Sequence, residues 1–515
     1  MNNVKKILLT ACLLIAPIAV AVSAEINVPA ITPADILTPD PGPAPRINGP
    51  LVYGVRPGSP FLYRIPCTGE RPIKFSAKDL PSGLTLDAQS GIITGTISSA
   101  GTNRVMLIAH NSHGTMKREF RIIVGKQLAL TPPMGWNSWY IYLHHVTEAG
   151  MRNTADIMIS SGMADYGYQY VNIDDCWARQ PNLMTNSEVG EPVRDPNGQI
   201  LPNARFPDIK GMVDYIHSKG LKTGIYTSPG PKTCAGFEGA WQHEAQDART
   251  FADWGFDFLK YDWCSYSGKV GEHTVDNFKK PYQQMWDELQ KQNRDIVFNL
   301  CQYGIGDVWK WGGDLGNCWR TTGDLGAARD TKLPGFYSIG FSNAKHWEYA
   351  RPGAWNDPDY ILIGWIGADH GKSFKQTALT ANEQYSYMSM WSLMASPLIY
   401  SGDMTRLDAF TLNVLCNAEV IAVDQDPLGR QAKILRQSDD EFVLVKDLED
   451  GSKAVGLFNL SGEPSNLTIS WADLGVSGKQ HVRDLWRQKD LGKFAQRFQT
   501  EVPRHGVTMV RVWSK

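Results

Sequence analysis

Hydrophobic and polar residues follow three different patterns along the chain. Residues 51 to about 125 carry short alternating runs, such as "RVMLIAH" (104–110) and "REFRIIV" (118–124), separated by the turn signals "PSG", "QSG" and "SAG". Alternation with a period of two is typical of strands that bury one face. We therefore expect a small antiparallel β-sandwich over residues 51–126.

From about residue 128 to 425, strand-like runs alternate with helical spacing. Met151, Ala155 and Met158, for example, recur at intervals that place them on one face of a helix. The eight strand-like runs are "PPMGWNSW", "YQYVNIDD", "LKTGIYT", "FDFLKYD", "IVFNLCQ", "CWRTTGD", "GAWNDPDYIL" and "SPLIYSGD". This pattern predicts an α/β fold with a (β/α)8 TIM barrel over residues 127–428. A doubly wound open sheet is the structural alternative.

After "AVDQDPLGRQ" the helical spacing ends and alternation returns. The runs "EFVLVKD", "KAVGLFNL", "NLTISW" and "GVTMVRVW" have the length and spacing of strands. We expect residues 429–515 to form an antiparallel β-sandwich domain.

The first 24 residues have the pattern of an export signal. Two lysines precede an apolar run from Ile7 to Val22, and small residues up to Ala24 fit a cleavage site. We therefore expect an exported protein, periplasmic or secreted. "LTAC" around Cys12 is a weaker match to a lipoprotein site, because the apolar run before it is short. The proline-rich residues 25–50 are expected to form a semi-rigid linker.

Composition and charge exclude several classes of partner. The net charge of -2 and the pI near 6.6 give no basic excess for binding nucleic acid or anionic lipid. No later apolar run is long enough to span a membrane. No metal-binding spacing such as CxxC or HExxH occurs, so we predict neither a metal nor a cofactor. The oligomeric state is left open.

Polar and aromatic side chains stand at the ends of the predicted barrel strands. In chain order they are Trp136, Trp139, Asp174, Asp175, Tyr226, Lys260, Asp262, Gln302, Arg320, Asp324, Asp357 and Asp359. The carboxyl ends of barrel strands share one face, which carries the active site in enzymes of this fold. We expect these side chains to converge there.

Carboxylates together with tryptophans favour glycoside hydrolysis in an exported barrel. One carboxylate attacks the sugar or activates water, and the other protonates the leaving oxygen. The pattern alone leaves open which aspartate does which.

Seven motifs follow one another over the predicted barrel: "TPPMGWNSW", "NIDDCW", "KTCAGFEG", "FADWGFDFLKYDWC", "WRTTGD", "WNDPD" and "VIAVDQDPLG". Together they resemble glycoside hydrolase family 27, the α-galactosidase and α-N-acetylgalactosaminidase group. The resemblance implies a retaining, exo-acting α-galactosidase that needs no cofactor and acts on terminal α-linked galactose of oligo- or polysaccharides. "LPSGLTLDAQSGIITGT" (80–96) likewise resembles the immunoglobulin-like modules of bacterial secreted enzymes.

The resemblance implies a role for each residue at the strand ends. Asp262 in "KYDWC" takes the position of the nucleophile and Asp324 in "WRTTGD" that of the acid/base, with carboxyl groups about 5 to 5.5 Å apart. Lys260 would favour the charged form of Asp262. The predicted sugar-binding residues are Trp139, Asp174, Asp175, Tyr226, Lys260, Gln302, Arg320 and Asp359.

Asp174 and Asp175 correspond to the pair that serves the axial 4-hydroxyl and the 6-hydroxyl of galactose in this family. Neighbouring residues of a strand point to opposite faces, so both reach one sugar only if the strand ends there. A β-L-arabinopyranoside lacks the 6-hydroxymethyl group, and the presence of both aspartates favours galactose over it.

Gln302 in "LCQYG" departs from the family, in which many α-galactosidases have Glu and the N-acetylgalactosaminidases a small residue. A glutamine can donate and accept hydrogen bonds and leaves little room for an N-acetyl group. This favours a substrate with a 2-hydroxyl, although the surrounding loop also differs. α-N-acetylgalactosaminidase activity stays open as an alternative.

The same resemblance implies two disulfides, Cys234–Cys264 and Cys301–Cys318. Cys67, Cys176 and Cys416 have no evident partners, and Cys176 is expected to be a free thiol.

Other interpretations stay open at this point. Asp357 could cap a turn, Trp136 could belong to the core, and Arg320 could be a structural ion-pair partner. We expect the pair His144–His145 to lie on the surface, and we expect "YSYMSMWSLM" to form a helix that packs against the barrel. A non-catalytic galactose-binding protein and a metal-dependent hydrolase are the alternatives from other classes.

Overall fold

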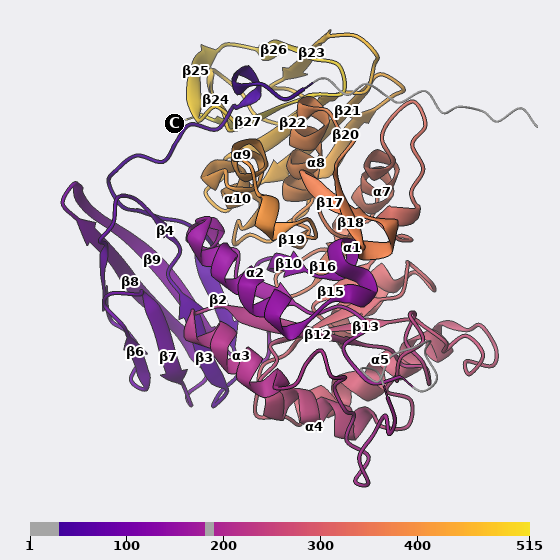
Figure 1. The fold of residues 1–515 in the computed structure, drawn as a ribbon. Helices are drawn as coiled ribbons and strands as arrows, with labels where there is room; N and C mark the ends of the chain where they lie inside the picture. The colour runs from indigo at the N-terminus through magenta and orange to yellow at the C-terminus, as the bar shows by residue number, and fades with distance from the viewer. Residues whose placement is uncertain (1–29, 181–189, 515) are drawn as a thin grey trace, which may run out of the picture.

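The computed structural model describes residues 30–180 and 190–514, which form three parts (Figure 1). An N-terminal β-sandwich lies against a central barrel, and a C-terminal β domain packs on the barrel next to α8 (Ala381–Leu393). The expected signal segment, 1–24, lies outside the described residues. Within the described ranges, no helix combines the length and apolarity needed to cross a membrane.

The central part is a curled sheet of eight parallel strands, one from each predicted run. They are β10 (Met134–Asn137), β11 (Tyr170–Asn172), β12 (Lys222–Thr227), β13 (Phe258–Asp262), β14 (Val297–Cys301), β15 (Cys318–Arg320), β16 (Trp355–Asp357) and β19 (Leu398–Tyr400). They lie side by side in chain order, and a parallel bridge between Ile361 and Tyr400 joins the two edges of the sheet. The barrel is confirmed, because a doubly wound sheet would reverse its strand order.

Helices cover the outside of the barrel. The longer ones are α2 (Glu148–Ser160), α3 (Ile209–Ser218), α4 (Glu244–Trp254), α5 (Val275–Gln290), α7 (Gly335–Ala344) and α8. α2 buries the predicted Met151, Ala155 and Met158 and begins where the Thr147 hydroxyl accepts a bond from the Gly150 amide. α8 contains the "YSYMSMWSLM" run and is buried along its whole length from Glu383 on, as expected for packing on the barrel.

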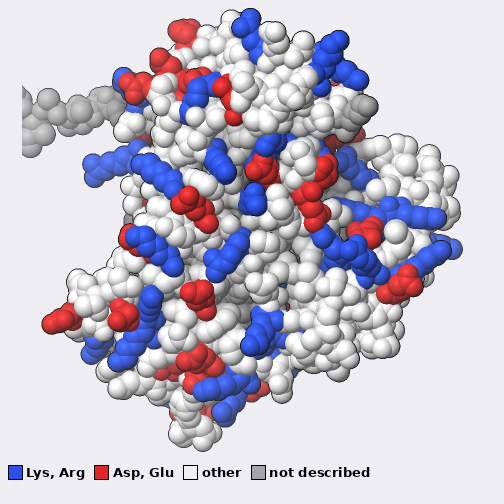
Figure 2. Space-filling model, turned by 180° about the vertical axis from the view of Figure 1, so that it is seen from behind, with Lys and Arg blue, Asp and Glu red and all other residues white. Residues whose placement is uncertain are grey.

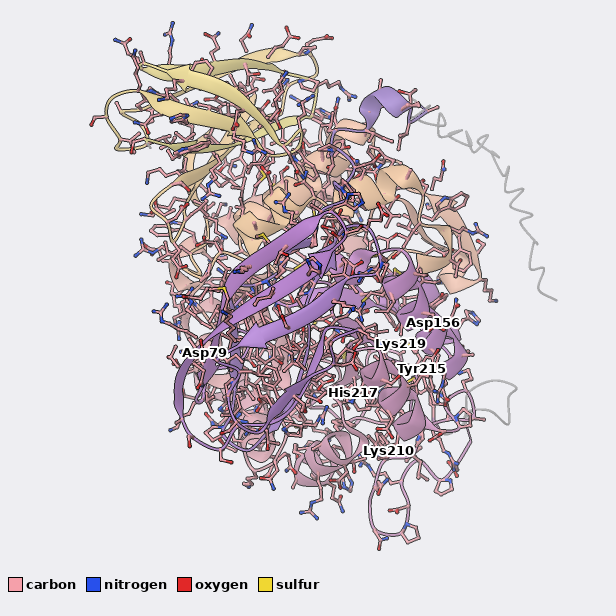
Figure 3. The ribbon with its side chains drawn as sticks, turned by 90° about the vertical axis from the view of Figure 1, so that its left-hand side faces the viewer. Asp79, Asp156, Lys210, Tyr215, His217 and Lys219 are labelled. Atoms are coloured by element: carbon pink, nitrogen blue, oxygen red, sulfur yellow. A yellow bond between two sulfur atoms is a disulfide. The ribbon has the colours of Figure 1, made fainter. Side chains whose placement is uncertain are left out.

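The outer face of α2 and α3 carries polar contacts, as Figure 3 shows. Asp156 of α2 pairs with Lys219 at 2.5 Å and also accepts a bond from the Tyr215 hydroxyl of α3. On the opposite side of the molecule from Figure 1, basic and acidic side chains are interspersed (Figure 2). That face therefore has no single-sign patch of the kind that binds nucleic acid.

The N-terminal β-sandwich is confirmed, and its strand pairs are antiparallel as expected except for the first and last strands, which pair in parallel. One sheet contains β2 (Val52–Val55), β9 (Gly114–Val124), β8 (Gly101–Asn111) and β5 (Lys74–Lys78), and the other β3 (Pro60–Arg64), β7 (Ile92–Thr96) and β6 (Leu84–Leu86). The stacked rings of Tyr63 and Phe120, 4.6 Å apart, lie between the sheets. Inward-facing residues alternate along each strand, which explains the period of two in the sequence.

The sandwich is fixed to the amino-terminal end of the barrel strands, opposite the predicted active face. Arg56 pairs with Asp295 at 2.7 Å and donates to main-chain carbonyls of residues 290–294. Lys222, the first residue of β12, bonds to the Tyr53 hydroxyl. The proline-rich segment is also anchored, since Thr38 and Asn413 exchange hydrogen bonds. The expected linker is therefore held on the barrel at Thr38, and near its end β1 (Arg46–Ile47) pairs with β4 (Cys67–Thr68) of the sandwich.

The C-terminal domain is antiparallel, as predicted. Its larger sheet contains β20 (Lys433–Gln437), β21 (Glu441–Asp447), β22 (Lys453–Asn459), β27 (Val507–Trp513), β24 (Gln480–Asp484) and β25 (Lys489–Phe494), and β23 (Ser465–Ser470) pairs with β26 (Arg497–Val502). Glu383 of α8 contacts His505 at 2.7 Å, and Ser389 of the same helix accepts a bond from Trp486. The domain is thus docked on α8.

Asp257 holds three barrel segments together just before β13. Its carboxylate contacts His217 at 2.8 Å and Arg294 at 2.6 Å, and it accepts a bond from the Thr223 amide. Burial opposes the charge, but His217 and Arg294 outweigh it and lower the pKa of Asp257 to about 2. The ionised carboxylate therefore stabilises the fold.

We expect Asp257→Asn to lower the free energy of unfolding by about 2 kcal/mol at pH 7, because the unfolded carboxyl has a pKa of about 3.9. In the wild type this contribution is complete above about pH 4 and is lost as the pH falls toward 2, so the variants should converge in acid. Urea unfolding at pH 7 and pH 3 measures the difference. The exposed Asp253→Asn is the matched control. An equal loss at both pH values would contradict the assignment.

Candidate active site

The predicted site residues come together at the carboxyl ends of the barrel strands. Asp262 is the last residue of β13 and Arg320 the last of β15, while Tyr226 lies near the end of β12. Asp174 and Asp175 follow β11, Asp324 follows β15 and Asp359 follows β16. Because the strands are parallel, all of these groups lie on the same face of the barrel.

Asp262 is buried and held through both carboxylate oxygens. The Tyr226 hydroxyl donates to Oδ2 at 3.1 Å and the Tyr303 hydroxyl to Oδ1 at 2.5 Å. Lys260 Nζ lies 3.9 Å from Oδ2. Burial raises the pKa of Asp262, the charge of Lys260 and the Tyr303 bond oppose this, and the charge of Asp324 adds to the rise. Lys260 thus favours the charged form, as predicted.

Lys260 links Asp262 to Asp174. Its ammonium group lies 2.9 Å from Asp174 Oδ2, an oxygen that also accepts a bond from the Tyr360 hydroxyl at 3.1 Å. The rings of Tyr226 and Tyr360 flank the ammonium at 5.2 and 5.3 Å. Burial lowers the pKa of Lys260, but Asp174 outweighs burial and raises it well above the usual value. Lys260 therefore stays charged beside the site.

Asp174 and Asp175 lie beyond the last residue of β11, Asn172, so the strand ends before them as expected. Asp175 accepts bonds from the Ala235 and Cys176 amides at 2.9 and 2.7 Å. Burial is the main cause that raises the pKa of Asp175 to about 7. The two neighbouring carboxylates thus have different partners: Asp174 pairs with Lys260, whereas Asp175 accepts bonds from main-chain amides.

Arg320 joins Asp324 to Asp359. Its guanidinium lies 3.2 Å from each carboxylate, so Arg320 is an ion-pair partner within the site. Asp359 is buried and also accepts bonds from the Tyr140 hydroxyl and the Leu325 amide, both at 2.8 Å. The Asp324 side chain is 48% exposed. Asp359 therefore fixes the segment that carries Asp324, and Asp324 faces outward.

Two residues at the strand ends have structural roles. Trp136 is fully buried and donates to the Gly402 carbonyl at 2.9 Å, so it belongs to the core. Asp357 accepts a bond from the Asp359 amide at 2.9 Å and therefore caps the turn around Pro358. Both structural interpretations are confirmed.

A cavity of about 390 Å³ opens next to Asp324. It lies between α1 (Trp139–Tyr142) and the hairpin of β17 (Trp365–Ala368) and β18 (Ser373–Gln376). Its lining consists of Trp139, Tyr140, Leu143, Asp324, Gly326, Ala327, Gly367, Ala368, His370 and Gly371. The lining combines aromatic rings with small residues, which leaves room for a ring-shaped group beside the carboxylate.

Known protein families match all three parts of this chain. The model for alpha galactosidase A matches residues 131–426, more than half of the sequence. The chain belongs to this family of glycoside hydrolases. The alpha galactosidase C-terminal beta sandwich domain matches residues 439–512, and an Ig domain matches residues 44–125.

Individual members of the alpha galactosidase family are similar over most of their length. The alpha-galactosidase of Cyamopsis tetragonoloba is 39% identical over 76% of this chain and 88% of its own. Alpha-galactosidase A of Cellvibrio japonicus is 36% identical over 75% of this chain and 93% of its own. Alpha-galactosidase I of Mortierella vinacea superposes with a TM-score of 0.67 at 32% identity, covering 75% of this chain and 98% of its own.

Two further tyrosines contact Asp262 and Asp174 in this member of the alpha galactosidase family but were not predicted. Gln302, which was predicted, is fully buried, and its side-chain amide donates to the Ile305 carbonyl at 2.8 Å. The next residue, Tyr303, contacts Asp262 instead, and Tyr360 contacts Asp174. Both tyrosines directly follow a predicted site residue, Gln302 or Asp359, at a strand end, and that position was the available signal.

One disulfide prediction is confirmed and one is wrong. Cys234 and Cys264 are bonded and join the segments after β12 and β13. Cys301 and Cys318 are both free. Cys318 pairs in register with Asn299, two residues before Cys301. This offset along neighbouring strands separates the two Cα atoms by roughly 8 Å, beyond the disulfide limit of about 7 Å.

Cys67, Cys176 and Cys416 are free, in keeping with their lack of evident partners. Cys176 Sγ lies 3.3 Å from His144 Nδ1. His144 and His145 are exposed, as predicted. Burial raises the pKa of the Cys176 thiol well above its usual value, so the thiol stays protonated at neutral pH.

Proposed function

We propose that this enzyme is a retaining, exo-acting α-galactosidase that removes terminal α-linked D-galactose from oligo- or polysaccharides. The observation that carries the proposal is the arrangement of two carboxylates with different surroundings. Asp262 is buried among Tyr226, Tyr303 and Lys260, and Asp324 faces a cavity. Lys260 and the Tyr303 hydroxyl favour the ionised form that a nucleophile needs, against the effect of burial, whereas Asp324 lies beside the space for a leaving group, where an acid/base must act.

The proposed reaction has two steps. Asp262 attacks the anomeric carbon and forms a β-linked glycosyl-enzyme, while Asp324 donates a proton to the departing glycosidic oxygen. Asp324 then takes a proton from water, which attacks the same carbon and returns the electron pair to Asp262. Arg320 lies 3.2 Å from the Asp324 carboxyl group and orients it toward the cavity.

The sugar pocket favours galactose. Asp174, Asp175 and Lys260 provide the polar groups for an axial 4-hydroxyl and a 6-hydroxyl, and both aspartates follow the end of β11. A structure described as a β-L-arabinopyranosidase from Geobacillus stearothermophilus is also similar, with a TM-score of 0.66 at 26% identity over 75% of this chain and 97% of its own. Arabinopyranosidase activity is therefore the alternative, and α-N-acetylgalactosaminidase activity a further one.

The cavity beside Asp324 suits the leaving group. An acid must lie next to the glycosidic oxygen, so the group attached to that oxygen occupies the space that Asp324 faces. Trp139 and Tyr140 offer aromatic surfaces for a second sugar ring. The cavity supports an oligosaccharide or a polysaccharide side chain as substrate.

We expect the purified protein to hydrolyse p-nitrophenyl α-D-galactopyranoside faster than the β-L-arabinopyranoside and the N-acetyl-α-D-galactosaminide. Parallel measurement of kcat/KM for the three substrates tests this, and NMR of the first product identifies the anomer. Faster turnover of either of the other two substrates would contradict the assignment of galactose as the sugar that the enzyme removes. Binding of galactose without turnover would favour a non-catalytic binding protein, and loss of activity in EDTA a metal-dependent hydrolase.

Export is part of the proposal. The Cys234–Cys264 disulfide supports it, because disulfides persist in oxidising compartments. The fractionation of the expressed full-length chain, followed by sequencing of its amino terminus, tests cleavage after Ala24.

A further inference from the structure

The carboxylate of Asp262 is fixed by a residue outside the set predicted from the family resemblance. Tyr226 of β12 donates to one oxygen and Tyr303, two residues after β14, donates to the other. The Tyr303 bond, at 2.5 Å, is shorter than the Tyr226 bond, at 3.1 Å. Short bonds to an ionised acceptor are the strong ones.

The loop that carries Tyr303 holds this side chain in place. Tyr303 has a φ of +63°, a left-handed conformation that costs free energy for a residue with a side chain. The Gly304 amide donates to the Arg320 carbonyl at 3.0 Å, and the Gln302 side chain donates to the Ile305 carbonyl at 2.8 Å. These contacts tie both sides of Tyr303 to β15 and to the loop itself.

The ring of Tyr303 is also bounded by the site. The Arg320 guanidinium lies 5.9 Å from the ring centre, and the hydroxyl lies 3.8 Å from Cys234 Sγ of the disulfide. The Cys234–Cys264 disulfide thus packs beside the tyrosine hydroxyl and limits its movement. Strained backbone conformations persist mainly at functional sites, where the surroundings hold them in place. The enclosure of Tyr303 and its bond to the reacting carboxylate therefore indicate a functional role.

We propose that Tyr303 is a positioning residue for the nucleophile: its hydroxyl fixes the rotation of the Asp262 carboxylate and maintains it in the ionised form. The inference rests on the proposed covalent role of Asp262. The short Tyr303 bond fixes Oδ1, so that Oδ2, which receives only the longer Tyr226 bond, points in a defined direction; this lowers the entropy lost when Oδ2 attacks the anomeric carbon. When the glycosyl bond breaks, the same hydroxyl stabilises the returning negative charge.

The groups that face Asp262 define the expected sign of the pH effect. Lys260 and the Tyr303 hydroxyl favour the charged carboxylate, whereas burial and the charges of Asp324 and Asp174 oppose it. The neighbours that do not carry charge at neutral pH are the Tyr226 hydroxyl, the Cys301 thiol and the Cys234–Cys264 disulfide. Loss of the Tyr303 hydroxyl therefore raises the pKa of Asp262.

The test uses Tyr303→Phe in the full chain with α-D-galactosyl fluoride as substrate. Fluoride departs without a proton, so its release reports the nucleophile with little contribution from Asp324. We expect kcat/KM to fall roughly 10- to 100-fold, the worth of a hydrogen bond to a charged group. We also expect the acidic limb of its pH profile to move to higher pH.

Controls separate the possible outcomes. Phe retains the ring, and equal thermal unfolding of the variant and the wild type shows that the fold is intact. Tyr349→Phe, a tyrosine of the outer 3-10 helix Trp347–Tyr349, should leave both rate and pH profile unchanged. An unchanged acidic limb in a folded Tyr303→Phe protein overturns the inference. Failure of the wild type to release fluoride instead overturns the proposed function.

Discussion

Replacement of Asp262 by alanine is expected to reduce the hydrolysis of α-galactosides on the order of 10⁴-fold or more, the range seen when a covalent nucleophile is removed. The loss should appear in kcat with every leaving group, because the glycosyl-enzyme cannot form. The alanine leaves a space among Tyr226, Tyr303 and Lys260, in which the two hydroxyls have lost their acceptor while the Lys260 ammonium stays paired with Asp174.

A small anion should use that space. With p-nitrophenyl α-D-galactopyranoside and sodium azide, Asp262→Ala is expected to form β-galactosyl azide, because azide attacks from the face that the carboxylate occupied. The measurements are the initial rate with and without azide and the anomeric configuration of the product by NMR. Asp253→Ala, an exposed aspartate of α4, is the matched control and should retain full activity.

Either of two results would contradict this role. Substantial activity of Asp262→Ala without azide would mean that another group attacks the sugar. An azide product of α configuration would mean that azide enters from the side of Asp324. Thermal unfolding of the variant checks that it is folded, because Asp262 is buried and its replacement could disturb the fold. The Lys260 ammonium keeps Asp174 as its partner in the variant, so no buried cation is left unpaired.

The barrel could be predicted from the sequence because each strand is covered on both faces. All five residues of β13, Phe258–Asp262, are buried, and the polar ones among them, Lys260 and Asp262, lie at the end where the site begins. Such runs are mostly apolar and bounded by loops, and they recur with helical spacing between them. Strand position therefore follows from local patterns, and site position follows from strand ends.

The C-terminal domain was predicted less completely, for the opposite reason. β25, Lys489–Phe494, has five exposed residues followed by one that is half-buried, so its sequence has no apolar alternation to reveal a strand. Its place is fixed by pairing with β24, which a local pattern does not contain. Edge strands of this kind depend on tertiary contacts.

The details of the site depend on loop conformation and register. Gln302 and Tyr303 are adjacent, and the left-handed φ of Tyr303 decides that the tyrosine, not the glutamine, contacts Asp262. The error at Cys301–Cys318 has the same origin, because a shift in register along two strands separates cysteines that a resemblance had paired. Residue identities at strand ends could be predicted, whereas side-chain directions after them could not.

Replacement of Asp324 by alanine is expected to produce a loss that depends on the leaving group. For melibiose, whose leaving sugar needs a proton, kcat/KM should fall by about 10² to 10⁴-fold, the usual contribution of a positioned acid. For α-D-galactosyl fluoride, which needs none, the first step should be nearly unchanged. The difference follows from the position of Asp324, which faces the cavity for the leaving group.

The second step of the reaction gives an independent signature of the same residue. Without Asp324 no base activates water, so the glycosyl-enzyme should accumulate with the activated substrates and KM should fall with kcat. Added azide needs no base and should restore turnover, giving α-galactosyl azide with the configuration of the substrate retained. The azide products of the two alanine variants are thus expected to have opposite configurations.

The matched control for Asp324 is Asp314→Ala, an exposed aspartate of the short helix α6, Gly312–Leu315. It should hydrolyse melibiose and the fluoride at wild-type rates. An equal fall in kcat/KM of Asp324→Ala for both substrates would contradict an acid role. It would indicate a structural role instead, exerted through the ion pair with Arg320. Arg320 contacts both Asp324 and the buried Asp359, so removal of Asp324 leaves the guanidinium paired with Asp359 at 3.2 Å. Because that pairing remains, we expect the fold to tolerate the change, and the dependence on the leaving group to be the dominant effect.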